Sequence, residues 1–152
     1  MKIKTQKEET QQGLFDTLSA EMYCDGASSG NPGPSGIGVV INPAGDKDRS
    51  RRISEYIGTA TNNVAEYSAL LKGLETARSL GIQEIRIFMD SELLVRQING
   101  IYRVRNMNLM PLWVRAMNIL KGFAHYTVRH VPREMNKEAD SLARRAVTRA
   151  KK

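Results

Sequence analysis

Residues 22–41 read MYCDGASSGNPGPSGIGVVI, and this stretch predicts two strands joined by a tight turn. Met22 to Cys24 opens an extended, apolar segment that runs into Asp25. The residues that follow are rich in serine, glycine, proline and asparagine, which favour turns. Ile37 to Ile41 is apolar and mostly β-branched, as is typical of a buried strand. We therefore expect a hairpin with an acidic residue at the end of its first apolar run.

The rest of the chain extends this hairpin into a mixed α/β pattern. Residues 51–59 predict a third strand, so that 22–59 forms an antiparallel meander. Asn63 followed by Glu66 matches a capping box at the start of a helix, and leucines repeat at helical spacing until Gly81. The remaining pattern predicts a strand at 85–89, helices at 92–99 and 111–121, a strand at 126–131 and a last helix capped by Asn136. This order favours a mixed sheet covered by helices.

The length of 152 residues is that of one domain. Residues 1–20 are polar, and we expect them to form an extension outside a domain that covers 21–149, with a basic tail at 150–152. No apolar run approaches the roughly 18 residues of a membrane span, so we expect no membrane contact. We also expect a monomer. The single cysteine, Cys24, excludes an internal disulfide and favours a reducing, cytoplasmic location.

The charge of the chain indicates a polyanionic partner. Lysine and arginine number 23 against 16 acidic residues, which gives a net charge of +7. Residues 144–152 contain five of these basic residues and no acid. A basic surface of this strength commonly binds nucleic acid and less often an anionic membrane. Simple solubility is the alternative that charge alone leaves open.

Acidic residues lie at the points where an α/β fold gathers its ligands. Asp25 ends an apolar strand segment, Glu66 and Asp140 lie in the first turns of helices, and Asp90 follows a strand. Ligands of such folds collect at the ends of strands, so the four side chains could converge. Each also has a local explanation, because helix caps, helix dipoles and turns favour acidic residues.

Convergence of these carboxylates would require a cation. Two carboxylates about 4 Å apart repel each other by roughly 4 kcal/mol at an effective dielectric constant of 20. Oxygen ligands without a cysteine and histidine cluster favour Mg²⁺ or Mn²⁺, and two such ions would balance four carboxylates. Paired divalent ions can activate a water and stabilise the leaving oxygen of a phosphodiester. A basic protein with such a site is a candidate nuclease.

Four segments of the sequence resemble the motifs of a single nuclease family. They are DGASSGNPGPSG at 25–36, TNNVAE at 61–66, DS at 90–91 after a strand, and NKEAD at 136–140. One such motif would be a weak signal, but four in this order on the expected elements are specific. The chain therefore resembles type 1 ribonuclease H over roughly residues 22–148.

The resemblance implies the ribonuclease H-like fold, a mixed five-stranded sheet flanked by helices. It also implies an endoribonuclease that hydrolyses the RNA strand of RNA–DNA hybrids and leaves 5′-phosphate and 3′-hydroxyl ends. The family's metal-binding carboxylates match Asp25, Glu66, Asp90 and Asp140, and the glutamate also contacts a ribose 2′-hydroxyl. Its substrate-binding positions match Gly26, Ala27, Ser28 and Asn31 along the RNA strand, and Thr61 and Asn62 at a phosphate of the DNA strand.

The sequence departs from the family pattern at two places. Many members carry an assisting histidine on the loop before the last aspartate. Counting back from Asp140 reaches His130, whereas an alignment that keeps Val131 in the strand puts Glu134 there, and we prefer the second. Some members also insert a basic handle helix, which this chain lacks; Arg103, Arg105 and the basic C-terminal residues are partial substitutes. A non-catalytic module that binds hybrid or double-stranded RNA, and a nuclease that also cuts double-stranded RNA, stay open.

Overall fold

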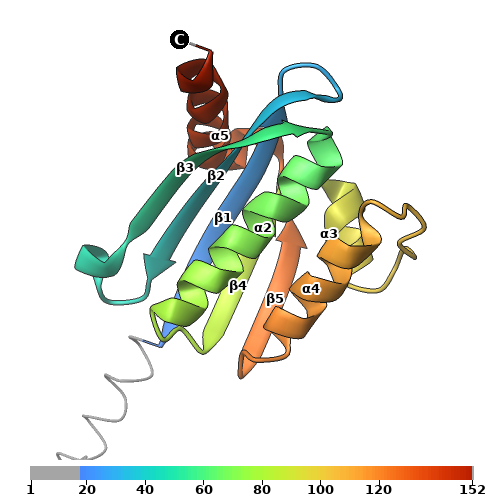
Figure 1. Ribbon diagram of the computed structural model, residues 1–152. Helices are drawn as coiled ribbons and strands as arrows, with labels where there is room; N and C mark the ends of the chain where they lie inside the picture. Colours follow the sequence, from blue (N-terminus) through green and yellow to red (C-terminus); the bar gives the residue numbers. More distant parts are fainter. Residues whose placement is uncertain (1–17, 152) are drawn as a thin grey trace, which may run out of the picture.

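The computed structural model describes residues 18–151, which form one sheet with helices on both faces (Figure 1). The elements follow the predicted order, with two short 3₁₀ turns added. They are β1 (Ser19–Ser28), β2 (Gly33–Pro43), η1 (Lys47–Arg49), β3 (Arg51–Ala60), α2 (Asn62–Ser79), β4 (Glu84–Met89), α3 (Glu92–Ile98), α4 (Met110–Leu120), β5 (His125–His130), η2 (Arg133–Met135) and α5 (Lys137–Ala150).

The sheet has five strands in the order β3-β2-β1-β4-β5, so the first strand lies at its centre. β1 pairs antiparallel with β2, and β2 pairs antiparallel with β3. β4 and β5 are added in parallel, with Tyr23 of β1 opposite Phe88 of β4. The predicted mixed five-stranded sheet with an antiparallel first half is therefore confirmed. The parallel pairing brings the ends of β1 and β4 to the same edge.

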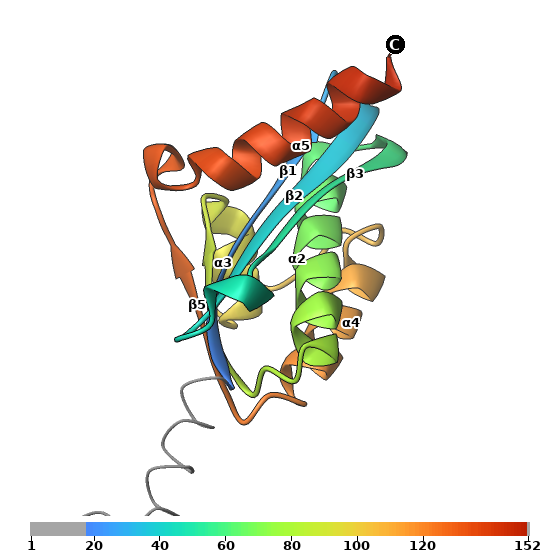
Figure 2. The same ribbon diagram turned by 90° about the vertical axis from the view of Figure 1, so that its left-hand side faces the viewer.

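The helices form two layers, one on each face of the sheet (Figure 2). α2 packs on β1 and β2 and contacts α4, while α5 crosses β1, β2 and β3 on the other face. The core between the sheet and α2 is apolar, because β1 and β2 turn alternate side chains toward it and α2 supplies a row of leucines and alanines. Its fully buried members include Met22, Val39, Leu70, Leu74 and Ile87. Burial of such side chains stabilises the fold by about 2 kcal/mol each.

Most element boundaries differ from the sequence prediction by one or more residues, and four of the differences bear on the argument. β1 begins at Ser19, so two residues assigned to the extension pair in the sheet. α2 begins at Asn62 with Thr61 as its N-cap, whose side chain accepts a hydrogen bond from the Val64 amide, so the capping box based on Asn63 is wrong. The last helix continues to Ala150, one residue into the predicted tail. β5 ends at His130 rather than at Val131, although the Val131 amide still donates to the carbonyl of Met89.

Residues 1–17, most of the predicted extension, lie outside the described residues. In the part that is described, no helix has both the length and the apolar character needed to cross a bilayer.

Candidate active site

The four acidic side chains predicted to converge line one cleft. Asp25, Glu66 and Asp90 each offer a carboxylate oxygen, and these oxygens all lie within 4.8 Å of one another. Asp140 borders the same cleft, which has a volume of about 760 Å³ and opens at the edge of the sheet where β1 and β4 end. Four separate elements or their flanks supply these groups, so the cleft exists only in the folded chain.

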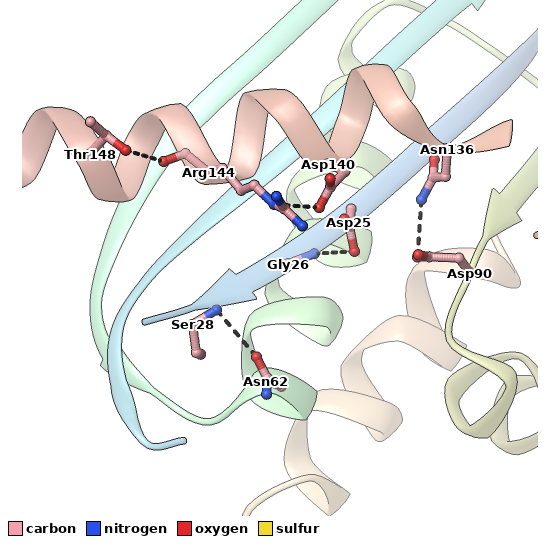
Figure 3. Close-up of polar contacts among 9 residues, drawn as sticks. All are labelled: Asp25, Gly26, Ser28, Asn62, Asp90, Asn136, Asp140, Arg144 and Thr148. Atoms are coloured by element: carbon pink, nitrogen blue, oxygen red, sulfur yellow. Dashed lines mark hydrogen bonds and ion pairs between the residues drawn. The ribbon is translucent and has the colours of Figure 1, made fainter. Parts of the chain in front are cut away.

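The parallel pairing of β1 and β4 brings the first two carboxylates together. Tyr23 of β1 lies opposite Phe88 of β4. Asp25 and Asp90 each come two residues later, so they stand at equivalent positions along the two neighbouring segments. Asp25 is still within β1 and its side chain is buried, whereas Asp90 follows the last residue of β4. The backbone amide of Gly26 donates to Asp25 Oδ1 at 3.0 Å and helps to fix the carboxylate (Figure 3).

A glycine in β1 lets α2 bring in Glu66. A Cβ atom at Gly26 would lie 2.3 Å from the carbonyl carbon of Ala65, so any side chain would push the first turn of α2 away. Gly26 therefore allows the close approach of the helix backbone. Since Thr61 caps α2, the Glu66 carboxylate is not a capping group and can face the cleft.

A second glycine lets α5 bring in Asp140. Gly38 of β2 pairs with Asp25, and a Cβ atom on it would lie 2.0 Å from the carbonyl oxygen of Ala139. The backbone of α5 therefore rests directly on the sheet next to Asp25. Because Asp140 follows Ala139, its carboxylate reaches the cleft from the face of the sheet opposite to α2.

A buried asparagine supports this cluster, and sequence reasoning missed it. Asn136 is 1% exposed, and its Nδ2 donates to the carbonyl of Cys24 at 3.0 Å. The same Nδ2 donates to Asp90 Oδ1 at 3.2 Å (Figure 3). It occupies the N-cap position of α5, as predicted, but its side chain makes no capping hydrogen bond. It links β1, the end of β4 and the start of α5. An asparagine before a helix reads as a cap, so no local signal indicated this role.

Burial and mutual repulsion keep protons on the cluster. Burial, followed by the charge of Asp90, raises the pKa of Asp25 to about 9, and a hydrogen bond with Asp140 adds to the effect. Burial also raises the pKa of Glu66 to about 7; a hydrogen bond with Ser91 opposes the rise and the charge of Asp90 adds to it. Carboxylate oxygens this close repel one another when they are ionised. They are also the ligands that a hard divalent cation prefers. The residues therefore fit such an ion.

The comparisons with known proteins agree with this geometry. A family model described as reverse transcriptase-like matches residues 23–146. Ribonuclease HI of Halobacterium salinarum is 42% identical over 125 residues, which cover 82% of this chain and 62% of that protein. Ribonuclease H of Pelobacter propionicus is 34% identical over 146 residues, 87% of this chain and 86% of that protein. The chain belongs to the ribonuclease H family.

A solved ribonuclease H supports the same assignment. The crystal structure of LC11-RNase H1 in complex with an RNA/DNA hybrid matches with a TM-score of 0.80 and 39% identity, over 88% of this chain and 99% of that one. Several curated relatives are longer than this chain. It spans 62% of the halobacterial protein and 36% of a bifunctional protein from Mycobacterium tuberculosis that is 41% identical.

Most of the positions that match the family's substrate contacts line the cleft. They are Gly26, Ala27, Ser28, Asn62 and Glu66, whereas the lining of the described cleft does not include Asn31 or Thr61. Asn62 Oδ1 accepts a hydrogen bond from the Ser28 amide at 3.2 Å (Figure 3). Asn31 Oδ1 accepts one from the Asn62 amide at 3.0 Å, and Thr61 caps α2. In this structure Asn31 and Thr61 therefore hold the start of α2, where Asn62 lies.

The two auxiliary candidates lie outside the cleft. His130 is the last residue of β5 and is exposed, which confirms that it is a strand residue. Glu134 lies in η2, where its neighbour Arg133 borders the cleft. Within residues 18–151, the lining of the cleft includes neither His130 nor Glu134.

Three basic residues border the cleft and were not placed there from the sequence: Arg133, Arg144 and Lys151. Arg144 Nε lies 3.2 Å from Asp140 Oδ1 (Figure 3). The spacing of four residues on one helix was a usable signal for this pair, since such residues are neighbours on the helix surface. Arg133 follows from the course of the loop before α5 and had no such signal.

The raised pKa values predict how the metal-free protein responds to pH. Asp25 and Glu66 hold their protons more tightly in the folded than in the unfolded protein. The free energy of unfolding is therefore highest near pH 4 and falls as the pH rises, through about 7 for Glu66 and about 9 for Asp25. Asp25→Asn should flatten this decline and, in chelator at pH 8, raise the melting temperature by about 5 °C. Thermal denaturation between pH 5 and 9 measures it. Glu84→Gln, at an exposed acid, is the control; a pH response in Asp25→Asn equal to that of the wild type would contradict the prediction.

Proposed function

We propose that the chain is an endoribonuclease that hydrolyses the RNA strand of RNA–DNA hybrids and leaves 5′-phosphate and 3′-hydroxyl ends. The observation that carries this proposal is the set of carboxylate oxygens of Asp25, Glu66 and Asp90 within 4.8 Å of one another, in one cleft with Asp140. The LC11 enzyme that was solved with a hybrid has the same fold and 39% identity, which supports the choice of substrate.

The four carboxylates, Asp25, Glu66, Asp90 and Asp140, are the residues proposed to hold two divalent ions, Mg²⁺ or Mn²⁺. When bound, such ions activate a water and stabilise the leaving 3′-oxygen, so no covalent intermediate is needed. Two divalent charges offset four carboxylates and favour the loss of the protons that burial, together with the charge of Asp90, otherwise keeps on Asp25 and Glu66.

The remaining residues orient the carboxylates and the substrate. Asn136 Nδ2 donates to Asp90 Oδ1 and so holds the Asp90 carboxylate in one orientation, preorganised to bind a metal ion. Glu66 faces the cleft from α2 and is proposed to accept a hydrogen bond from the ribose 2′-hydroxyl next to the scissile phosphate. That hydroxyl distinguishes RNA from DNA locally.

The wall formed by the end of β1 and the start of α2 is the proposed contact with the sugars and phosphates of the hybrid. Ser28 and Asn62 are tied together by a hydrogen bond of 3.2 Å, and Asn31 holds the Asn62 backbone. Gly26, Ala27, Ser28 and Asn31 are proposed to follow the RNA strand, and Thr61 and Asn62 a phosphate of the DNA strand. Contacts to both backbones read the shape of the duplex and not its sequence.

Cleavage assays with three substrates test the function. End-labelled RNA–DNA hybrid, double-stranded RNA and DNA duplex are each incubated with Mg²⁺, with Mn²⁺ and with excess chelator. We expect cleavage of the RNA strand of the hybrid with a divalent ion and none with chelator. Binding of the hybrid without cleavage in any metal would show a non-catalytic module. Equal cutting of double-stranded RNA would show a broader nuclease.

A further inference from the structure

The walls of the cleft differ in charge. The end of β1 and the start of α2 contribute uncharged polar residues: Ser28, Ser29, Asn62 and Asn63. η2, α5 and the residue that follows α5 contribute the basic residues that line the described cleft: Arg133, Arg144 and Lys151. Lys151 Nζ donates one hydrogen bond to Ser29 Oγ at 2.6 Å, which leaves two of its three N–H donors. The floor between them holds the four carboxylates. A polyanion bound at the floor therefore meets its electrostatic attraction on the α5 side.

Three residues at the end of α5 that line the cleft form one row. Arg144 and Thr148 belong to α5 and Lys151 is its C-cap; their spacing of four and three positions places them on one face of the helix. Figure 3 shows Arg144 reaching toward Asp140, with Thr148 one turn further along α5. At 1.5 Å per residue, Arg144 and Lys151 are about 10 Å apart along the axis. A nucleic-acid strand carries a phosphate about every 3.4 Å of axis, so the row spans about three nucleotides.

The other basic residues of α5 have different surroundings. Arg149 Nη2 donates to the carbonyl and hydroxyl oxygens of Ser54 at 3.0 and 2.8 Å, so it is bound to β3. Arg145 is exposed and does not line the cleft. Arg144 contacts Asp140 through Nε alone, its side chain is 60% exposed, and an arginine has five N–H donors. An ion pair this exposed is weak and can rearrange when a phosphate arrives.

We propose that Arg144 and Lys151 form a phosphate track that binds the backbone of the RNA strand beside the scissile position. Thr148 lies between them in the row and donates its hydroxyl hydrogen to the Arg144 carbonyl at 3.1 Å. This α5 track rests on the proposed function, because the carboxylates define which strand lies on the floor. The row begins at the guanidinium that touches Asp140 and continues within the same cleft. The phosphates within its reach are therefore the next ones on the strand being cut, because the partner strand lies across a groove.

Salt-dependent binding tests the track without relying on cleavage. Hybrid affinity is measured by fluorescence anisotropy with Mg²⁺ in Asp90→Asn protein, at salt concentrations from 50 to 300 mM. Adding Arg144→Gln and Lys151→Gln should weaken binding at least about tenfold near 150 mM and reduce the slope of log affinity against log salt by about 2. Arg145→Gln removes the same charge from the same helix and should change affinity less than about threefold. Equal losses in Arg145→Gln and Arg144→Gln, or no loss in the double variant, would overturn the track.

Neutral phosphates identify the strand. Single methylphosphonate linkages are placed in the RNA or the DNA strand, and each is combined with the double variant in a double-mutant cycle. At one to three RNA linkages on one side of the cut, a neutral linkage should no longer lower the hybrid affinity of the double variant. Neutral linkages in the DNA strand should lower its affinity by the same factor as in the protein without the two substitutions. Coupling to the DNA strand would contradict the assignment. If the wild-type protein binds the hybrid but never cleaves it, the proposed nuclease function is refuted. The binding measurements still test the track, because they do not depend on cleavage.

Discussion

Asp90→Asn is expected to reduce the rate of hybrid cleavage by a factor of about 10³ or more, with the fold intact. The substitution removes one negative charge from a cluster whose oxygens lie within 4.8 Å of one another, and it weakens the hold on a divalent ion. A thousandfold loss corresponds to about 4 kcal/mol of transition-state stabilisation. The side-chain oxygen of the new asparagine can still accept the hydrogen bond from Asn136, so the local structure has no reason to change.

Single-turnover cleavage rates, together with a melting curve, measure this effect. Glu92→Gln is the matched control, because Glu92 is an exposed acid two residues away that pairs with Arg96 at 2.7 Å. It should cleave at close to the wild-type rate. Wild-type activity in Asp90→Asn with metal present would reject the proposed role of the carboxylates.

Gly38→Ala is expected to lower the free energy of unfolding by about 3 kcal/mol, or the melting temperature by about 10 °C. The added methyl group would lie 2.0 Å from the carbonyl oxygen of Ala139 and 2.7 Å from the amide nitrogen of Ala143. Both are backbone atoms of α5, so the helix as a whole must move away from the sheet. Since Asp140 belongs to this turn, cleavage should fall as well.

Chemical denaturation followed by circular dichroism measures the change in stability. Gly122→Ala is the control, because a Cβ atom at this position meets only the carbonyl oxygen of Ile119, at 3.3 Å. Its unfolding free energy should stay within about 0.5 kcal/mol of the wild-type value. A Gly38→Ala protein as stable as the wild type would show that α5 does not rest on β2 as closely as described.

The order of the elements was predictable because the sequence marks it locally. The β-branched run at Ile37, the leucine spacing through Leu74 and the turn at Gly81 each reflect a period or a backbone preference that neighbouring residues determine. Boundaries were less predictable. Thr61 and Asn63 are both good caps, and in the structure it is Thr61 that caps α2.

The site could be predicted only in part, because its supporting contacts join distant segments. The acidic positions follow from strand and helix ends, and the family resemblance gave them roles. The hydrogen bond from Asn136 to Asp90 joins residues 46 positions apart, and no local pattern indicates it. The place of Arg133 in the cleft depends in the same way on the path of a loop.

The late position of α5 in the chain has a consequence for synthesis. A ribosome makes Asp25, Glu66 and Asp90 well before it makes Asp140. No helix can pack against Gly38 of β2 until α5 has left the exit tunnel. Nascent chains that carry most of the acidic residues should therefore leave nearby transcripts intact, and premature termination should yield fragments that are harmless to RNA.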